Sequence, residues 1–115
     1  MKFTTSLNKN YEFRRLYNRG KSAGSSYIVI YCRRNGTKSN RLGITVSKKI
    51  GWAVLRNLVR RRLKEIYRLN EVKLNHGYDI VIVARVKIRT AQYKEIDASA
   101  KQLLKKLGLL VHTPT

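Results

Sequence analysis

Residues 78–84, Y-D-I-V-I-V-A, are apolar at nearly every position. A strand with one buried face alternates apolar and polar residues, whereas a strand covered on both faces reads as a continuous apolar run. The segment is therefore typical of a central strand. We expect it to form the middle of a sheet that is covered on both faces.

Two further strands are expected upstream of this run. Residues 27–33, Y-I-V-I-Y-C-R, are rich in aromatic and β-branched side chains, which favour strands. One face of this strand holds Tyr27, Val29 and Tyr31, and the other holds Ile28, Ile30 and Cys32. Residues 41–47 alternate apolar residues with small or polar ones, namely Gly43, Thr45 and Ser47, which leave room for a backbone or a ligand to approach. The Asn35-Gly36 pair between the two runs is a turn signal and predicts an antiparallel hairpin.

Three helices are also expected. Residues 9–19 form the first, with Asn8 as its cap and Gly20 as its stop. One face of this helix carries Phe13, Leu16 and Tyr17 and is therefore largely aromatic. Residues 52–69 form the second, whose cations point outward and whose buried stripe consists of Trp52, Leu55, Val59, Leu63 and Ile66. The third runs from Thr90 or Ala91 to Leu107 and stops at Gly108.

The order of these elements predicts the fold class. A short strand near residues 22–26 completes the series α-β-β-β-α-β-α, which makes a two-layer α+β sandwich with about four strands, mostly antiparallel. We expect residues 1–115 to form a single domain with a flexible tail at residues 109–115. The general rule favours a right-handed strand–helix–strand crossover.

The charge of the chain indicates its kind of partner. Lys and Arg number 26 against six Asp and Glu, a formal net charge of +20. Such charge destabilises the compact state unless a polyanion or counterions neutralise it. We expect a nucleic-acid partner, although charge alone does not choose between RNA, DNA and anionic lipid. No apolar run approaches the roughly 20 residues of a membrane span, and residues 1–10 lack the apolar section of a secretory signal. We expect a cytoplasmic protein.

Catalytic groups are scarce in the sequence. No acid lies between Glu12 and Glu65, and the other acids lack the paired spacing of a two-metal nuclease or a general acid/base couple. The single cysteine, Cys32, can form neither an internal disulfide nor a thiolate-rich zinc site, and we expect it in the core. The two histidines, His76 and His112, belong to no ligand pattern. We do not expect an enzyme that works alone.

The basic centre of the chain resembles a known family. The run from Arg41 to Arg68, R-L-G-I-T-V-S-K-K-I-G-W-A-V-L-R-N-L-V-R-R-R-L-K-E-I-Y-R, is closely similar to the signature of the bacterial ribonuclease P protein subunit. In that family a strand ending in V-S-K-K precedes G-x-A-V-x-R-N and a basic helix. Residues 7–20 resemble the family's first helix and residues 78–85 its last strand, so the resemblance covers most of the chain.

The resemblance implies an accessory protein that binds a large catalytic RNA and helps it remove the 5′ leader from precursor transfer RNA. Hydrolysis is then performed by Mg²⁺ held mainly in the RNA, and the protein supplies no catalytic residue, no tightly bound cofactor and no obligate protein partner. The family also implies a left-handed crossover instead of the right-handed default, in a fold similar to a ribosomal protein domain.

The same resemblance assigns two binding surfaces. The RNA-binding residues that match the family are Ser47, Lys48, Lys49, Arg56, Asn57, Arg60, Arg61 and Lys64. The leader-binding residues are Phe13, Tyr17 and Tyr31. Phe13 and Tyr17 are adjacent on one helical face, and aromatic rings stack on unpaired bases with little sequence preference. Judged from the residues alone, the three rings are more simply explained as core aromatics.

Two positions depart from the family pattern. Trp52 stands where the family usually has Asn, and Leu58 stands where a basic residue often follows the R-N pair. A Trp at the start of the helix either stacks on an RNA base or covers the edge of the core.

Three alternative functions remain open at this point. A ribosomal or other structural RNA-binding protein explains the charge and the fold but gives no reason for an aromatic cleft. A nuclease that acts alone needs Mg²⁺-binding carboxylates. Nonspecific DNA binding is compatible with a charge of +20, because any duplex backbone attracts it.

Overall fold

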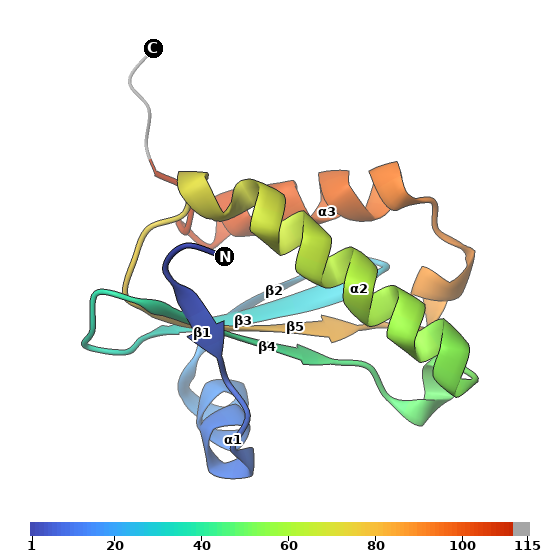
Figure 1. Cartoon of the computed structure of the whole chain (residues 1–115), viewed down its shortest axis with the longest axis horizontal. Coiled ribbons are helices and arrows are strands. Elements are labelled where there is room, and N and C mark those ends of the chain that lie inside the picture. Colours follow the sequence, from blue (N-terminus) through green and yellow to red (C-terminus); the bar gives the residue numbers. More distant parts are fainter. Residues whose placement is uncertain (112–115) are drawn as a thin grey trace.

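The computed structural model describes residues 1–111 and contains one five-stranded sheet with the strand order β1-β4-β5-β3-β2 (Figure 1). The strands are β1 (Thr4–Ser6), β2 (Lys21–Gly24), β3 (Ile28–Arg34), β4 (Asn40–Thr45) and β5 (Tyr78–Ala84). The helices are α1 (Asn10–Arg19), α2 (Ala53–Asn70) and α3 (Tyr93–Lys106), with short 3₁₀ turns η1 (Lys48–Ile50), η2 (Glu71–Lys73) and η3 (Val86–Thr90).

The central position of β5 is confirmed. It pairs with β3 in antiparallel and with β4 in parallel orientation, and Ile80, Val81 and Ile82 are almost completely buried. A strand between two neighbours satisfies its backbone hydrogen bonds on both edges, and its apolar side chains enter the core on both faces.

The predicted hairpin is wrong. Strands β3 and β4 do not pair with each other, because β5 lies between them. The connection of residues 35–39 passes the end of β5, where the Asn35 N–H donates to the Gly77 carbonyl. Two strand spacings amount to roughly 10 Å, which five residues span easily. Placing the apolar β5 in the centre buries more surface than a direct β3–β4 pair does.

The α+β class is confirmed, with two differences in detail. The sheet has five strands instead of four because residues 4–6 pair with the edge of β4. Two of its strand pairs are parallel (β1–β4, β4–β5) and two are antiparallel (β2–β3, β3–β5). In Figure 1, β4 and β5 point the same way, β5 lies behind β4 and α2 lies above them, so the crossover is left-handed. This is the hand that the family resemblance implies, and it departs from the right-handed general rule.

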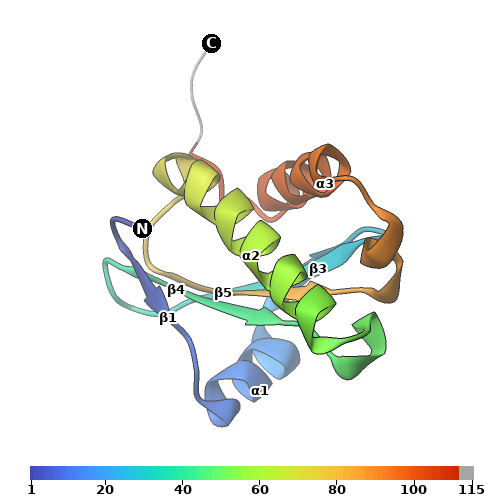
Figure 2. The ribbon, with the colours of Figure 1, turned by 45° about the vertical axis from the view of Figure 1, so that its right-hand side comes forward.

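The helices divide unequally between the two faces of the sheet. Figure 2 shows α2 and α3 over one face and α1 against the other. The main core lies under α2 and α3 and includes Ile28, Ile30, Cys32, Val59, Leu63, Ile66, Ile96, Leu103 and Leu104. On the α1 face the described residues form a small buried apolar cluster, consisting of Leu7, Leu16 and Val81.

Several predicted boundaries shift. Asn8 does not cap α1, because Lys9 occupies the cap position and makes no side-chain cap bond. Tyr27 precedes β3 and donates its hydroxyl to Glu95 of α3, so it does not share the face of Tyr31. Within the predicted tail, Leu109 is buried and Leu110 pairs with Leu74, and residues 112–115 lie outside the described residues.

Trp52 does not join the core stripe of α2. The residue precedes the helix with an extended backbone, so the spacing of the helical stripe does not apply to it. Its side chain is 85% exposed. Val59, Leu63 and Ile66 are buried as predicted, and Leu55 is half-buried.

Candidate nucleic-acid interface

Three aromatic side chains converge between α1 and the sheet. The Tyr17 and Tyr31 rings meet edge to face with centroids 4.9 Å apart, and the Phe13 and Tyr17 centroids lie 6.5 Å apart. Tyr17 is 39% exposed, and the other two rings are partly buried. The rings predicted from the family resemblance are thus adjacent and accessible, and we call Phe13, Tyr17 and Tyr31 the aromatic cleft.

Small residues of β4 make room for these rings. A Cβ atom on Gly43 would lie 2.6 Å from Cζ of Phe13, so the ring packs directly on the glycine backbone. The Tyr17 hydroxyl is 3.1 Å from Oγ1 of Thr45. A pocket of about 320 Å³ is lined by Asn10, Phe13, Arg14, Tyr17 and Thr45. The small residues of β4 leave room as predicted, but α1 side chains occupy that room instead of a backbone or a ligand.

A network of charges fixes α1 to the sheet at one end of the cleft. Arg41 of β4 donates from Nε and Nη2 to the two carboxylate oxygens of Asp79 at 2.8 and 2.6 Å, and it also bonds the buried carboxylate of Glu12 on α1. The hydrogen bonds to Asp79 raise the pKa of the Arg41 guanidinium. The three residues lie far apart in the sequence, and their pattern gave no signal for this network.

Each of the six acids of the chain is engaged within the protein. Besides the two that bind Arg41, Glu65 pairs with Arg68 and Asp97 with Lys101. Glu71 accepts the Lys2 backbone N–H, and Glu95 accepts the Tyr27 hydroxyl. Residues 1–111 contain four ion pairs: two at Arg41, one at Arg68 and one at Lys101. None of them includes a predicted RNA-binding residue. The internal pairing of the acids therefore leaves the predicted RNA-binding residues without an ion pair within residues 1–111.

The predicted RNA-binding residues lie on η1, its preceding loop and α2. We call this set the basic ridge: Ser47, Lys48, Lys49, Arg56, Asn57, Arg60, Arg61 and Lys64. All are exposed except Arg56, which is half-buried with an Nε atom that has no partner among the described residues. Arg60 donates to Oδ1 of Asn57 at 3.2 Å, which orients both polar groups.

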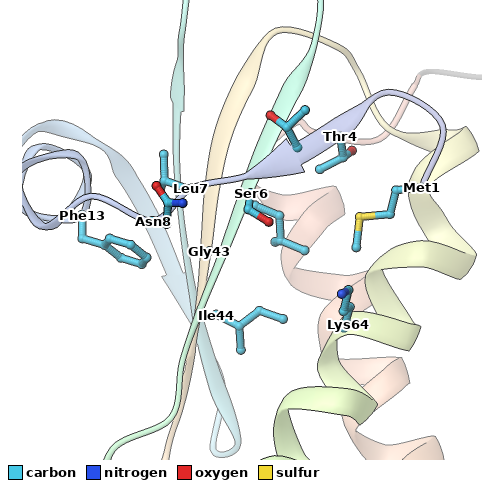
Figure 3. A pocket seen from close by; sticks show the side chains of 11 residues that line it. Met1, Thr4, Ser6, Leu7, Asn8, Phe13, Gly43, Ile44 and Lys64 are labelled. Carbon is cyan, nitrogen blue, oxygen red and sulfur yellow. The ribbon is translucent and has the colours of Figure 1, made fainter.

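Strand β4 connects the cleft to the ridge. Thr45, at the end of β4, contacts Tyr17, and only two residues separate it from Lys48. A second connection runs along β1, where a pocket of about 490 Å³ has Phe13 at one end and Lys64 at the other (Figure 3). Met1, Thr4 and Ser6 also line this pocket, and no sequence pattern had indicated them.

Two further groups of cations were missed. A pocket of about 720 Å³ beside the ridge is lined by Ser47, Lys49, Arg85 and Lys87 among others. Its signal was available, because Arg85 ends the segment that resembles the family's last strand. A separate pocket of about 470 Å³ near the end of β3 contains Arg19, Lys21, Arg33 and Arg34. Its members come from three elements and share no sequence pattern.

The described part of the chain contains neither a group of metal ligands nor a membrane-spanning helix. Residues 1–111 contain no group of three His, Cys, Asp or Glu side chains with the geometry to hold a metal ion. Among the same residues, no helix is both long and apolar enough to cross a bilayer. Cys32 is buried, and burial raises the pKa of its thiol.

The fold and its surface define a small basic α+β protein with an accessible aromatic cleft beside a cationic ridge. A family model described as Ribonuclease P matches residues 1–108. The Ribonuclease P protein component of Clostridioides difficile (strain 630) is 47% identical over 109 residues, which cover 94% of this chain and 96% of that protein. The one from Alkaliphilus oremlandii (strain OhILAs) is 46% identical over 110 residues, with 96% of each covered.

Solved structures agree with these relatives. The RNase P protein of Staphylococcus aureus is similar with a TM-score of 0.85 and 32% identity, covering 92% of this chain and 97% of that one. The RNase P protein from Thermotoga maritima has a TM-score of 0.80 and 32% identity, with 88% and 96% covered. The chain belongs to the ribonuclease P protein family.

Proposed function

We propose that this protein is the accessory subunit of a ribonuclease P. It binds the catalytic RNA through the basic ridge and the 5′ leader of precursor transfer RNA through the aromatic cleft, and so promotes removal of the leader in the cytoplasm. The observation that carries this proposal is the direct link between the two surfaces: β4 leads from the ring of Tyr17 to Lys48 within a few residues.

The two surfaces suit different parts of an RNA. Guanidinium groups bind phosphates in bidentate fashion, and Asn57 can hydrogen-bond a base or a 2′-hydroxyl. The cleft instead presents ring faces and edges, which stack on unpaired bases for about 1–3 kcal/mol each without strict sequence demand. A single-stranded leader of variable sequence fits the cleft, and a folded RNA fits the ridge.

The reaction itself belongs to the partner RNA in this proposal. The RNA holds the Mg²⁺ ions that perform the hydrolysis, while this chain binds and orients the substrate. The engagement of the carboxylates in ion pairs and hydrogen bonds supports this division, because such groups are already committed to holding the fold.

A cleavage assay separates this function from that of a structural RNA-binding protein. Precursor transfer RNA is incubated at low Mg²⁺ with this protein, with a bacterial ribonuclease P RNA, and with both together. We expect rapid leader removal only in the mixture. No gain over the RNA alone would favour a structural RNA-binding protein, and cutting by the protein alone would overturn the proposed mechanism.

The leader assignment has its own test. Phe13→Ala and Tyr31→Ala should weaken binding of precursor with its leader and leave mature transfer RNA unaffected. Tyr11→Ala is the matched control, because Tyr11 lies on the same helix, is 57% exposed and does not line the cleft pocket. Equal losses for both RNAs would contradict the assignment.

The ridge is tested by the salt dependence of RNA binding. Arg60→Gln should reduce the slope of log affinity against log salt by about 0.7–0.9 for each lost phosphate contact. Lys105→Gln removes an exposed cation on α3 and should leave the slope unchanged. An unchanged slope for Arg60→Gln would mean that this cation remains solvated in the complex.

A further inference from the structure

Trp52 is the most conspicuous apolar side chain on the surface. It is the single tryptophan of the chain, and at 85% exposed it exceeds every other large hydrophobic residue in the described part of the chain. Burial of aromatic rings is a major source of stability, and this ring contributes almost none of it. Covering the edge of the core is therefore not its role.

The backbone that carries this ring is firmly held. Trp52 lies between η1 and α2, and its carbonyl accepts the Arg56 N–H at 2.9 Å in the first turn of the helix. On the other side, Gly51 donates its N–H to the Lys48 carbonyl at 3.1 Å. The ring thus projects into solvent from a fixed position.

The surroundings of the ring select a polyanionic partner. Lys48 and Lys49 precede it, Arg56 and Asn57 follow it, and no acid occurs between Glu12 and Glu65. Trp52 also lies at the N-terminus of α2, where the free N–H groups and the helix dipole favour negative charge. A bound phosphate backbone is attracted to these groups, and its bases are then the only apolar surfaces that it can present to the ring.

We propose that Trp52 stacks on an unpaired base of the RNA that the basic ridge binds. The inference rests on the proposed function for the identity of that RNA, and adds to it a base contact at the start of α2. A ring face stacks on any base, so the contact selects for an unpaired nucleotide at this point and not for a sequence.

The single tryptophan makes the contact directly measurable. We expect addition of a bacterial ribonuclease P RNA to quench the tryptophan fluorescence and to protect it from acrylamide. Trp52→Ala should weaken RNA binding by about 5- to 150-fold, which corresponds to one stacked base, and Trp52→Phe should retain part of the affinity. The salt slope should not change, because no phosphate contact is lost.

Val54→Ala is the matched control, because Val54 is 82% exposed two residues away and has no ring. It should bind RNA normally. Since Trp52 is exposed, the far-UV circular dichroism and thermal unfolding of Trp52→Ala should match those of the parent, so a loss of affinity is not a loss of folding.

Each other outcome has a distinct meaning. Tight RNA binding with tryptophan that stays accessible to acrylamide, or an affinity loss below about 2-fold for Trp52→Ala, overturns the stacking proposal and leaves the proposed function standing. Equal quenching by a fully duplex RNA probe overturns the requirement for an unpaired base. Quenching by vesicles of anionic phospholipid but not by RNA assigns the ring to a membrane surface and also overturns it. Failure to bind the RNA at all refutes the proposed function itself.

Discussion

The two faces of the sheet are built for different purposes. The face under α2 and α3 holds the large core, in which Leu63, Ile80 and Ile96 are inaccessible or nearly so. On the face under α1, which we call the thin face, the apolar cluster of the described residues consists of Leu7, Leu16 and Val81, and α1 is held there by an ion network as well as by packing. A thinly covered face leaves aromatic rings partly exposed and free to bind. Stability and binding are thus separated onto opposite sides of one sheet.

The strongest test of this comparison is a pair of identical truncations. Leu63→Ala in the large core should lower the free energy of unfolding by about 2–5 kcal/mol and leave the RNA affinity of the folded fraction unchanged. Leu16→Ala, on the thin face, should cost less stability but weaken binding of precursor with its leader, because α1 carries two rings of the cleft. Urea unfolding measures the stability of both variants. The phosphate concentration is kept fixed, since anions stabilise a protein with a charge of +20. A larger stability loss for Leu16→Ala would refute the comparison.

The ion network should be the next largest contributor. Arg41→Gln leaves the carboxylates of Glu12 and Asp79 close together, largely buried and without their cation. The full cost of breaking a buried pair, about 3–5 kcal/mol, is reduced by the 36% exposure of the Arg41 side chain, so we expect about 2–3 kcal/mol. Lys38→Gln removes an exposed cation from the nearby loop and should change stability by less than about 0.5 kcal/mol. Equal effects would mean that the network contributes nothing specific.

The sequence predicted those parts of the fold in which a local pattern determines the outcome. The unbroken apolar run of β5 required two covered faces, and the spacing of Val59, Leu63 and Ile66 required a helix with one buried side. Strand pairing is not local. The turn at Asn35-Gly36 exists, but the energy of burying β5 decides which strands become neighbours.

The candidate site was less predictable from the sequence than the fold, because only part of it lies on one element. The ridge as a set follows from the family resemblance; the outward side of one amphipathic helix accounts for its α2 members, whereas Ser47, Lys48 and Lys49 lie on η1 and its preceding loop. The convergence of Tyr17 with Tyr31 depended on the family resemblance, because residues on separate elements carry no shared spacing. Trp52 was assigned to the wrong side because it lies one residue outside the helix. The Arg41 network was not predicted at all, since its three members have no local relation.

Gly43 offers a smaller perturbation that acts on the thin face alone. In Gly43→Ala the new methyl group would clash with the Phe13 ring, which must move. We expect a loss of about 1–2 kcal/mol in stability from overpacking, together with weaker binding of precursor with its leader. At Gly24 of β2 the corresponding Cβ would lie 3.4 Å from Val29, an ordinary contact, so Gly24→Ala is the control and should affect neither quantity. Unchanged precursor binding in Gly43→Ala would show that the position of Phe13 does not matter for the cleft.

The smallest expected effect depends on pH and concerns the N-terminal segment, which leads through β1 to the thin face. Glu71 is 2% exposed at the end of α2 and accepts the Lys2 N–H at 2.6 Å, upstream of β1. Burial raises the pKa of this carboxyl, but hydrogen bonds from the N-terminal segment outweigh it and the net pKa lies below the ordinary value. The unfolded chain therefore takes up the proton first as the pH falls. This contribution to stability is complete above the ordinary pKa of Glu, near 4.3, and is lost as the pH drops through the lower folded value.

Comparison with Glu71→Gln isolates this contribution from those of the other acids. At neutral pH the variant should be less stable by about 1 kcal/mol, the usual size of one hydrogen bond, and the difference from the parent should shrink as the pH falls below about 4. Glu65→Gln, at an exposed pair with Arg68, should show a smaller difference because solvent screens it. Unfolding curves across this pH range measure the difference. If the gap between parent and Glu71→Gln stays constant, the carboxylate charge is not what holds the N-terminal segment, and the thin face depends on packing and on the Arg41 network alone.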